Sequence, residues 1–180
     1  PTGVIVHRAD GRFDLDALLA QARAWPGLEG MDLAKEVSTR QTYAWDETLW
    51  ALGAGYGRQS APRRHVVCID YGVKRNILRN LASTGAQITV VPATARFEEI
   101  QAHRPDGLFL SNGPGDPAAT GAYAIPVIRA ALDARLPTFG ICLGHQMLAL
   151  AVGAKTYKMH QGHRGANHPV KDLDPGKVEI

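Results

Sequence analysis

The sequence lacks most of the features that mark secreted, membrane-bound or nucleic-acid-binding proteins. Only two of its 180 residues are cysteines, Cys68 and Cys142, and both lie in apolar, strand-like stretches, so we expect reduced thiols rather than a disulfide. No apolar run approaches the ~18 residues that span a bilayer, and residues 1–14 become too polar for a signal peptide. The formal net charge is +3, without a run of five basic residues, which argues against a nucleic-acid surface. We therefore expect a cytoplasmic protein that binds neither membranes nor nucleic acid.

A nucleotide-binding signature and an initiator methionine are also missing. No stretch fits G-x-x-x-x-G-K-[ST], the loop that cradles phosphates in many ATP-binding proteins. The chain opens on Pro1, and its last residues, "PGKVEI", are typical of the start of a strand. We therefore expect a piece of a longer protein.

The pattern of apolar residues along the sequence changes near residue 60. Residues 13–25 have the apolar spacing and early aspartates of a short helix. Residues 26–62 show no sustained periodicity and several glycines, which is typical of a linker. We therefore expect residues 1–60 to be the end of a smaller N-terminal domain plus a linker.

From residue 61 onward, short apolar runs alternate with amphipathic stretches. The expected strands cover residues 65–70, 87–92, 106–111, 137–142 and 154–159, and the expected helices cover residues 73–85, 96–105, 122–136 and 143–153. This alternation predicts βαβ units, and hence an α/β fold with a doubly wound, mostly parallel sheet. Residues 61–180 would be the first part of that larger domain.

A turn between an expected strand and an expected helix carries Cys142. The residues "GICLG" follow the pattern G-x-C-x-G, a nucleophile elbow with cysteine in the serine position. Gly140 and Gly144 leave room for a sharp turn, and the N-terminus of the following helix directs N–H groups and a positive dipole end at the sulfur, which favours the thiolate. A buried structural cysteine is the alternative, and we assign that role to Cys68. For Cys142 the pattern favours a nucleophile.

A second glycine-rich turn, "LSNGPGDP" at residues 110–117, follows another expected strand. Gly113 and Gly115 can adopt positive φ, which would turn backbone N–H groups toward a ligand. An ordinary loop is the alternative, because these residue types favour turns anyway. Ligands of open parallel sheets bind at the carboxyl ends of the strands, where both glycine-rich turns fall. Together they predict a nucleophile with nearby oxyanion donors.

The two motifs together resemble class I, triad-type glutamine amidotransferases, in which a G-x-C-x-G elbow carries the cysteine that attacks the side-chain amide of glutamine. Longer strings narrow the resemblance to the small, glutamine-hydrolysing chains of carbamoyl-phosphate synthases: "GLEGMDLAKEVS", "DYGVKRNILRNL", "LSNGPGDP", "FGICLGHQMLALAVGAKTYKM" and "GHRGANHPVKD". The resemblance covers nearly the whole chain. It implies L-glutamine as substrate, no cofactor in this chain, and a role in pyrimidine and arginine biosynthesis. Its partner would be the carbamoyl-phosphate synthase large chain, which would bind ATP and Mg.

The resemblance assigns roles to five residues. Cys142 would form a γ-glutamyl thioester and release ammonia, Leu143 would donate its backbone N–H to the oxyanion, and the loop at Gly113 and Gly115 would supply the other N–H. Gly113, Gly115, Leu143 and Gln146 match the family's glutamine-binding positions. The family's catalytic histidine and glutamate, in an H-x-E arrangement, would fall beyond the end of this chain, so we expect the isolated chain to hydrolyse little or no glutamine.

The histidines within the chain are weaker candidates for that base. His145 lies three residues after Cys142, and the resemblance gives it a supporting or packing role. His160, His163 and His168 lie in "HQGHRGANH", a spacing that invites a metal site, but no cysteine or carboxylate ligand pattern accompanies them. We expect a structural or interface loop there and no metal.

Two other functions stay open. A different class I glutaminase, of the anthranilate or GMP synthesis type, would share the elbow, although residues 1–60 argue against it because those glutaminases usually begin near the first strand. A truncated piece could also be a non-catalytic scaffold that keeps the fold.

Overall fold

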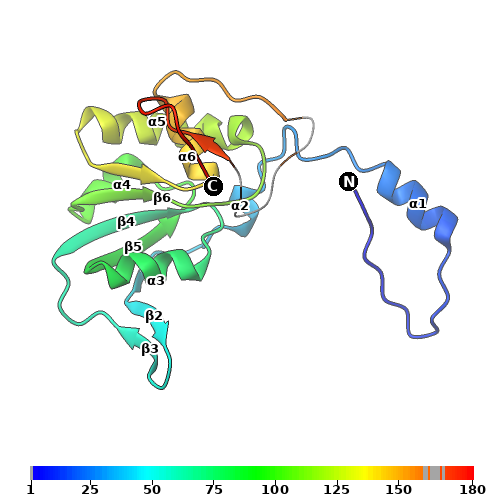
Figure 1. The fold of residues 1–180 in the computed structure, drawn as a ribbon, viewed down its shortest axis with the longest axis horizontal. Helices are drawn as coiled ribbons and strands as arrows, with labels where there is room; N and C mark the ends of the chain where they lie inside the picture. The colour runs from blue at the N-terminus through cyan, green and yellow to red at the C-terminus, as the bar shows by residue number, and fades with distance from the viewer. Residues whose placement is uncertain (1, 160–161, 163–166, 168) are drawn as a thin grey trace.

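Alternating strands and helices build a five-stranded sheet between two helical layers (Figure 1). The computed structural model describes residues 2–159, 162, 167 and 169–180. The sheet order is β1 (Tyr43–Trp45), β5 (Ala86–Pro92), β4 (Arg64–Asp70), β6 (Gly107–Leu110) and β7 (Thr138–Gly140). β5, β4, β6 and β7 are parallel, and β1 pairs antiparallel with β5. The predicted α/β class with a mostly parallel sheet is confirmed.

The strands are apolar on both faces because both faces are covered. Successive side chains of a strand point to opposite sides of the sheet. In β4, Val67 and Ile69 join the core cluster that contains residues of α4 (Phe97–Ala102), α5 (Pro117–Asp133) and α6 (Leu143–Ala151). Cys68 joins the opposite cluster with Leu78 of α3 (Arg75–Ser83).

Helix α5 begins earlier than its apolar pattern indicates. The Asp116 side chain caps it by accepting a hydrogen bond from the Ala118 N–H at 2.9 Å, and Pro117 occupies the first helical position, where its missing N–H is no loss. Residues 117–121, expected as loop, are therefore helical. The helix continues past Pro126, as predicted.

The segment expected to be a linker is largely structured. Ala34 in α2 (Ala34–Val37) is fully buried in the core, β1 extends the sheet, and β2 (Glu47–Ala51) pairs with β3 (Gly55–Arg58) in a hairpin that contacts α3. The expectation of a linker over these residues is therefore wrong. The division of the chain into two domains near residue 60 stays a prediction.

The two ends of the chain add small elements. The predicted first helix is present as α1 (Leu15–Arg23), where the Asp14 carboxylate accepts from the Ala17 N–H at 3.0 Å. None of its residues is buried, and Figure 1 shows it apart from the sheet. The strand expected at residues 154–159 does not form, whereas β8 (Val170–Lys171) pairs with β9 (Val178–Glu179). No helix among the described residues is long and apolar enough to span a membrane.

Candidate active site

The turn between β7 and α6 holds Cys142 in an unusual backbone conformation. Its φ of 55° and ψ of −112° lie outside the regions that L-residues ordinarily occupy, and its side chain is exposed. Such a residue carries about 1–3 kcal/mol of strain, which persists where the surrounding structure fixes it. The predicted elbow is therefore present, with an accessible thiol at the N-terminal end of a nine-residue helix.

The two glycines of the elbow are required by close backbone contacts. A Cβ added to Gly140 would lie 2.6 Å from the carbonyl carbon of Gly144, and a Cβ added to Gly144 would overlap the carbonyl group of Leu110. Both glycines have φ values that other residues can adopt. They are therefore needed for space rather than for an unusual φ.

The glycine loop between β6 and α5 partly differs from expectation. Gly115 has a φ of +102°, as predicted, and an added Cβ would lie 2.7 Å from the carbonyl oxygen of Met31. Gly113 does not have positive φ, so that expectation is wrong. It must be glycine because a Cβ there would overlap the carbonyl oxygen of Tyr71.

The structure brings the loop and the elbow together. The N–H of Gly144 donates to the carbonyl oxygen of Ser111 at 3.1 Å. A Cβ on Gly113 would lie 3.0 Å from Cδ2 of Leu143, so these two predicted residues are neighbours. Within the described residues, the backbone N–H groups of Gly113 and Leu143 have no protein acceptor. No described residue therefore satisfies either N–H group, as a role as oxyanion donor requires.

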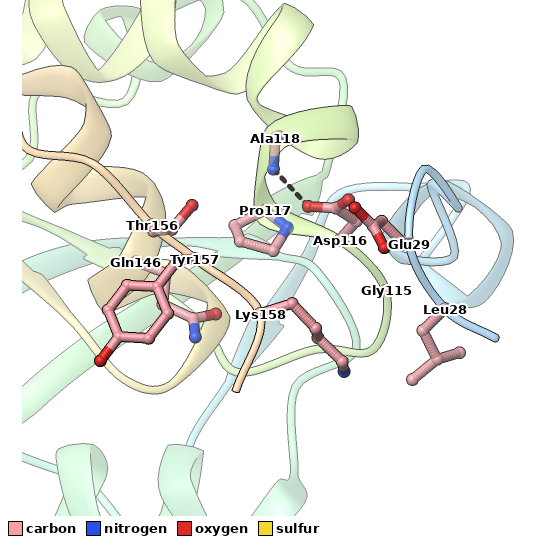
Figure 2. A pocket seen from close by; sticks show the side chains of 10 residues that line it. All are labelled: Leu28, Glu29, Gly115, Asp116, Pro117, Ala118, Gln146, Thr156, Tyr157 and Lys158. Carbon is pink, nitrogen blue, oxygen red and sulfur yellow. Dashed lines mark hydrogen bonds between the residues drawn. The ribbon is translucent and has the colours of Figure 1, made fainter. Parts of the chain in front are cut away.

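A pocket of about 470 Å³ lies beside the glycine loop and the first turns of α6 (Figure 2). Gly115 and Gln146, two of the predicted glutamine-binding residues, line it. Cys142, Gly113 and Leu143 are not among its lining residues. This volume is within the range of small-molecule sites.

Sequence reasoning missed the other side of this pocket. Figure 2 shows Gln146 on one side and Glu29 beside the capping carboxylate of Asp116 on the other, and Leu28 and Lys158 also line it. The Gly30 N–H donates to the Asp116 carboxylate at 2.8 Å, which brings the segment around Glu29 to the loop. Only the string "GLEGMD", through the resemblance that it carries, pointed to that segment.

Within the described residues, Cys68 and His145 do not extend the site. Cys68 is fully buried, both thiols are free, and burial raises the pKa of the Cys68 thiol well above its usual value. His145 is exposed on α6. The expectations for His160, His163 and His168 concern positions outside the described residues. Among the residues that are described, no cluster of three or more His, Cys, Asp or Glu could hold a metal ion.

A parallel sheet with a strained cysteine elbow beside a glycine loop is typical of one class of enzyme. Comparison with known sequences identifies that class. Residues 67–179 match the family described as Glutamine amidotransferase class-I. The chain therefore belongs to the class I glutamine amidotransferases.

Individual curated proteins of this family are similar over nearly the whole chain. The carbamoyl phosphate synthase small chain of Zymomonas mobilis is 66% identical over 98% of this chain and 48% of its own length. That of Caulobacter vibrioides is 65% identical over 100% of this chain and 46% of its own length. The chain thus spans about half the length of the curated relatives it matches.

One solved structure resembles part of the fold. It is a protein from Thermoplasma acidophilum described as belonging to a GMP synthase, it is 26% identical, and the match covers 60% of this chain and 51% of the other, with a TM-score of 0.46. At that TM-score the likeness supports no further conclusion.

Proposed function

We propose that this chain carries the nucleophile half of a glutaminase site in a carbamoyl-phosphate synthase small chain. The observation that carries the proposal is the strained, exposed Cys142 at the N-terminus of α6, next to Leu143, which lies beside Gly113 of the glycine loop. Identities of 63–66% to proteins named carbamoyl phosphate synthase small chain support the choice of this member of the family.

The chemistry begins at the sulfur of Cys142. Its thiolate attacks the side-chain amide carbon of L-glutamine, a C–S bond forms, and the carbonyl π electrons move to oxygen. When the tetrahedral intermediate collapses, the C–N bond breaks and the nitrogen leaves as ammonia after taking a proton from a general acid. Water then hydrolyses the γ-glutamyl thioester, which releases glutamate and restores the thiol.

The backbone N–H groups of Leu143 and the 113–115 loop would stabilise the negative oxygen of both tetrahedral intermediates. The absence of a protein acceptor, within the described part of the chain, for the N–H groups of Gly113 and Leu143 supports this role. Gly113, Gly115, Leu143 and Gln146 would bind glutamine, and the position of Gly115 and Gln146 in one pocket supports that assignment.

The general base and the synthetase step would lie outside this chain. Among the described residues, no hydrogen bond or ion pair orients the exposed His145 as a base, so we assign the base to a histidine and glutamate in the part of the protein that this chain does not cover. Ammonia would pass to a large partner chain that binds ATP and Mg, in cytoplasmic pyrimidine and arginine biosynthesis. This chain itself would need no cofactor.

The test uses the full-length protein with its large chain. Cys142→Ser should abolish glutamine-dependent synthesis but retain synthesis from added ammonia, and an electrophilic diazo-ketone analogue of glutamine should label the wild-type protein at Cys142. Full glutaminase activity in Cys142→Ser would overturn the proposal. Purification with a different synthetase would instead favour the anthranilate or GMP synthesis type.

The 180-residue chain alone provides a second test. It should hydrolyse little or no glutamine, because we place the general base in the part of the protein that this chain does not cover. Turnover near that of the full-length protein would require a general base within this chain, and His145 or another residue would then be the candidate.

A further inference from the structure

We propose that Ser111 is a positioning residue that fixes the direction of the Gly113 N–H and ties the glycine loop to the cysteine elbow. This inference rests on the proposed glutaminase function, because it concerns one of the two oxyanion donors. It assigns no contact with substrate to Ser111. Ser111 is fully buried at the carboxyl end of β6.

The hydroxyl of Ser111 has two hydrogen bonds whose directions are fixed by their partners. It accepts from the backbone N–H of Tyr71 at 2.8 Å, and it donates to the carbonyl oxygen of Asn112 at 2.8 Å. Because an N–H can only donate and a carbonyl can only accept, the hydroxyl hydrogen must point at Asn112.

The bond to Asn112 determines the orientation of the next N–H. The carbonyl of Asn112 and the N–H of Gly113 belong to one planar peptide unit, and no cis peptide occurs in the described residues. In a trans unit these two groups point in opposite directions. Holding the Asn112 carbonyl on Ser111 therefore aims the Gly113 N–H away from Ser111. Glycine gives this peptide more rotational freedom than other residues would, so the unit benefits from such an anchor.

The backbone of Ser111 holds the second half of the site. Its carbonyl oxygen accepts from the Gly144 N–H at 3.1 Å, in the first turn of α6 next to Leu143, and its own N–H donates to the carbonyl of Ile69 at 3.3 Å. One buried residue thus links β4, the glycine loop and the elbow. Its backbone links would survive a side-chain substitution, whereas the link to the Asn112–Gly113 peptide would not.

Removing the Ser111 hydroxyl therefore tests the contribution of one oxyanion donor, the Gly113 N–H. In the full-length protein with its large chain, we expect Ser111→Ala to lower kcat for glutamine hydrolysis about 10- to 100-fold, below the loss seen when an oxyanion donor is deleted outright. KM should change less than about threefold, because the donor acts in the transition state. Alkylation of Cys142 by iodoacetamide, which forms no oxyanion, should keep its wild-type rate.

A matched control separates positioning from general stability. The hydroxyl of Thr138 also donates to a backbone carbonyl, that of Leu136 at 2.9 Å, but at the start of β7. Thr138→Val should leave kcat unchanged while lowering the midpoint of urea unfolding. Ser111→Cys, which is slightly larger and keeps a weak donor, should fold if Ser111→Ala does not, and should have an intermediate kcat.

Two results would overturn the positioning role of Ser111. One is a kcat for both Ser111 variants equal to that of Thr138→Val, and the other is a fall in alkylation rate that matches the fall in kcat. Cys142→Ser is measured in parallel: if it retains glutaminase activity, the proposed function itself fails. If Cys142→Ser is inactive and Ser111→Ala is fully active, only the inference about Ser111 fails.

Discussion

The N–H of Gly144 donates a hydrogen bond of 3.1 Å to the carbonyl oxygen of Ser111, and this bond joins the helix that follows the cysteine to the glycine loop. The contact is possible because Gly144 has no side chain: an added Cβ would overlap the backbone carbonyl of Leu110 at the end of β6. The distance between the nucleophile turn and the loop is thus set by backbone packing.

Gly144→Ala should separate these two elements. The obstructing atoms are backbone, which cannot move as a side-chain end can, so we expect a loss of roughly 2–4 kcal/mol in the free energy of unfolding. Urea unfolding measures it, and slower alkylation of Cys142 would report the displaced elbow. Gly153→Ala is the control, because Gly153 has positive φ but open space around its Cα; it should lose only about 1 kcal/mol. Equal losses in the two variants would contradict the packing argument.

Cys142→Gly should stabilise the protein while removing its nucleophile. Glycine adopts a φ of 55° without the Cβ penalty, and the exposed thiol contributes little burial, so we expect a gain of about 1 kcal/mol. Cys142→Ala keeps the Cβ and should show no such gain. The difference between their urea midpoints measures the relief of backbone strain minus the cost of glycine's greater freedom in the unfolded chain. A glycine variant less stable than the alanine variant by the full ~1 kcal/mol of that entropic cost would mean that the elbow is not strained.

Most of the layered fold could be predicted from the sequence, because short apolar strands that alternate with amphipathic helices leave a strong signal. The short elements α2 and β1 could not be predicted. α2 and β1 have four and three residues, too few for a periodic pattern. β1 forms only because β5, which lies far along the chain, offers it an edge on which Tyr43 pairs with Val90 and Trp45 with Ile88.

The candidate site shows the same division. The elbow around Cys142 was predictable because its glycines flank it in the sequence. The need for glycine at position 113 was assigned to the wrong cause, since the obstacle is the carbonyl of Tyr71, a contact between strand ends that spacing does not reveal. Likewise, nothing in the local chemistry of Glu29 indicated that it would line the pocket with Gln146.

Asp70 should prove more important to stability than its lack of a catalytic role suggests. Its buried carboxylate accepts hydrogen bonds from the backbone N–H groups of Thr39 at 2.7 Å, Gly72 at 2.9 Å and Val73 at 2.8 Å. Asp70→Ala would leave these donors without their acceptor, so we expect a loss of roughly 3 kcal/mol. Trypsin should also cleave more readily after exposed Arg40, because the bond to Thr39 holds that segment to the sheet.

Asp10→Ala provides the control for that experiment. Asp10 is exposed and pairs with Arg8 at the surface, where such pairs contribute little. Its urea midpoint and trypsin pattern should match those of the wild-type protein. If Asp70→Ala behaves in the same way, the three backbone bonds do not hold the segment.

Stability should fall at alkaline pH because Cys68 is buried. Burial, with a smaller effect of the Asp70 carboxylate, raises the pKa of the Cys68 thiol well above its usual value in the folded protein. In the unfolded chain the thiol loses its proton at about pH 8.5. Above that pH the unfolded state binds fewer protons than the folded state, so the free energy of unfolding decreases, by up to about 1.4 kcal/mol per pH unit for this one group.

Urea unfolding of the wild-type protein and of Cys68→Ala between pH 8 and 10 measures the difference between their slopes of unfolding free energy against pH. A Cys68→Ala slope equal to that of the wild-type protein would mean that the buried thiol does not govern this range.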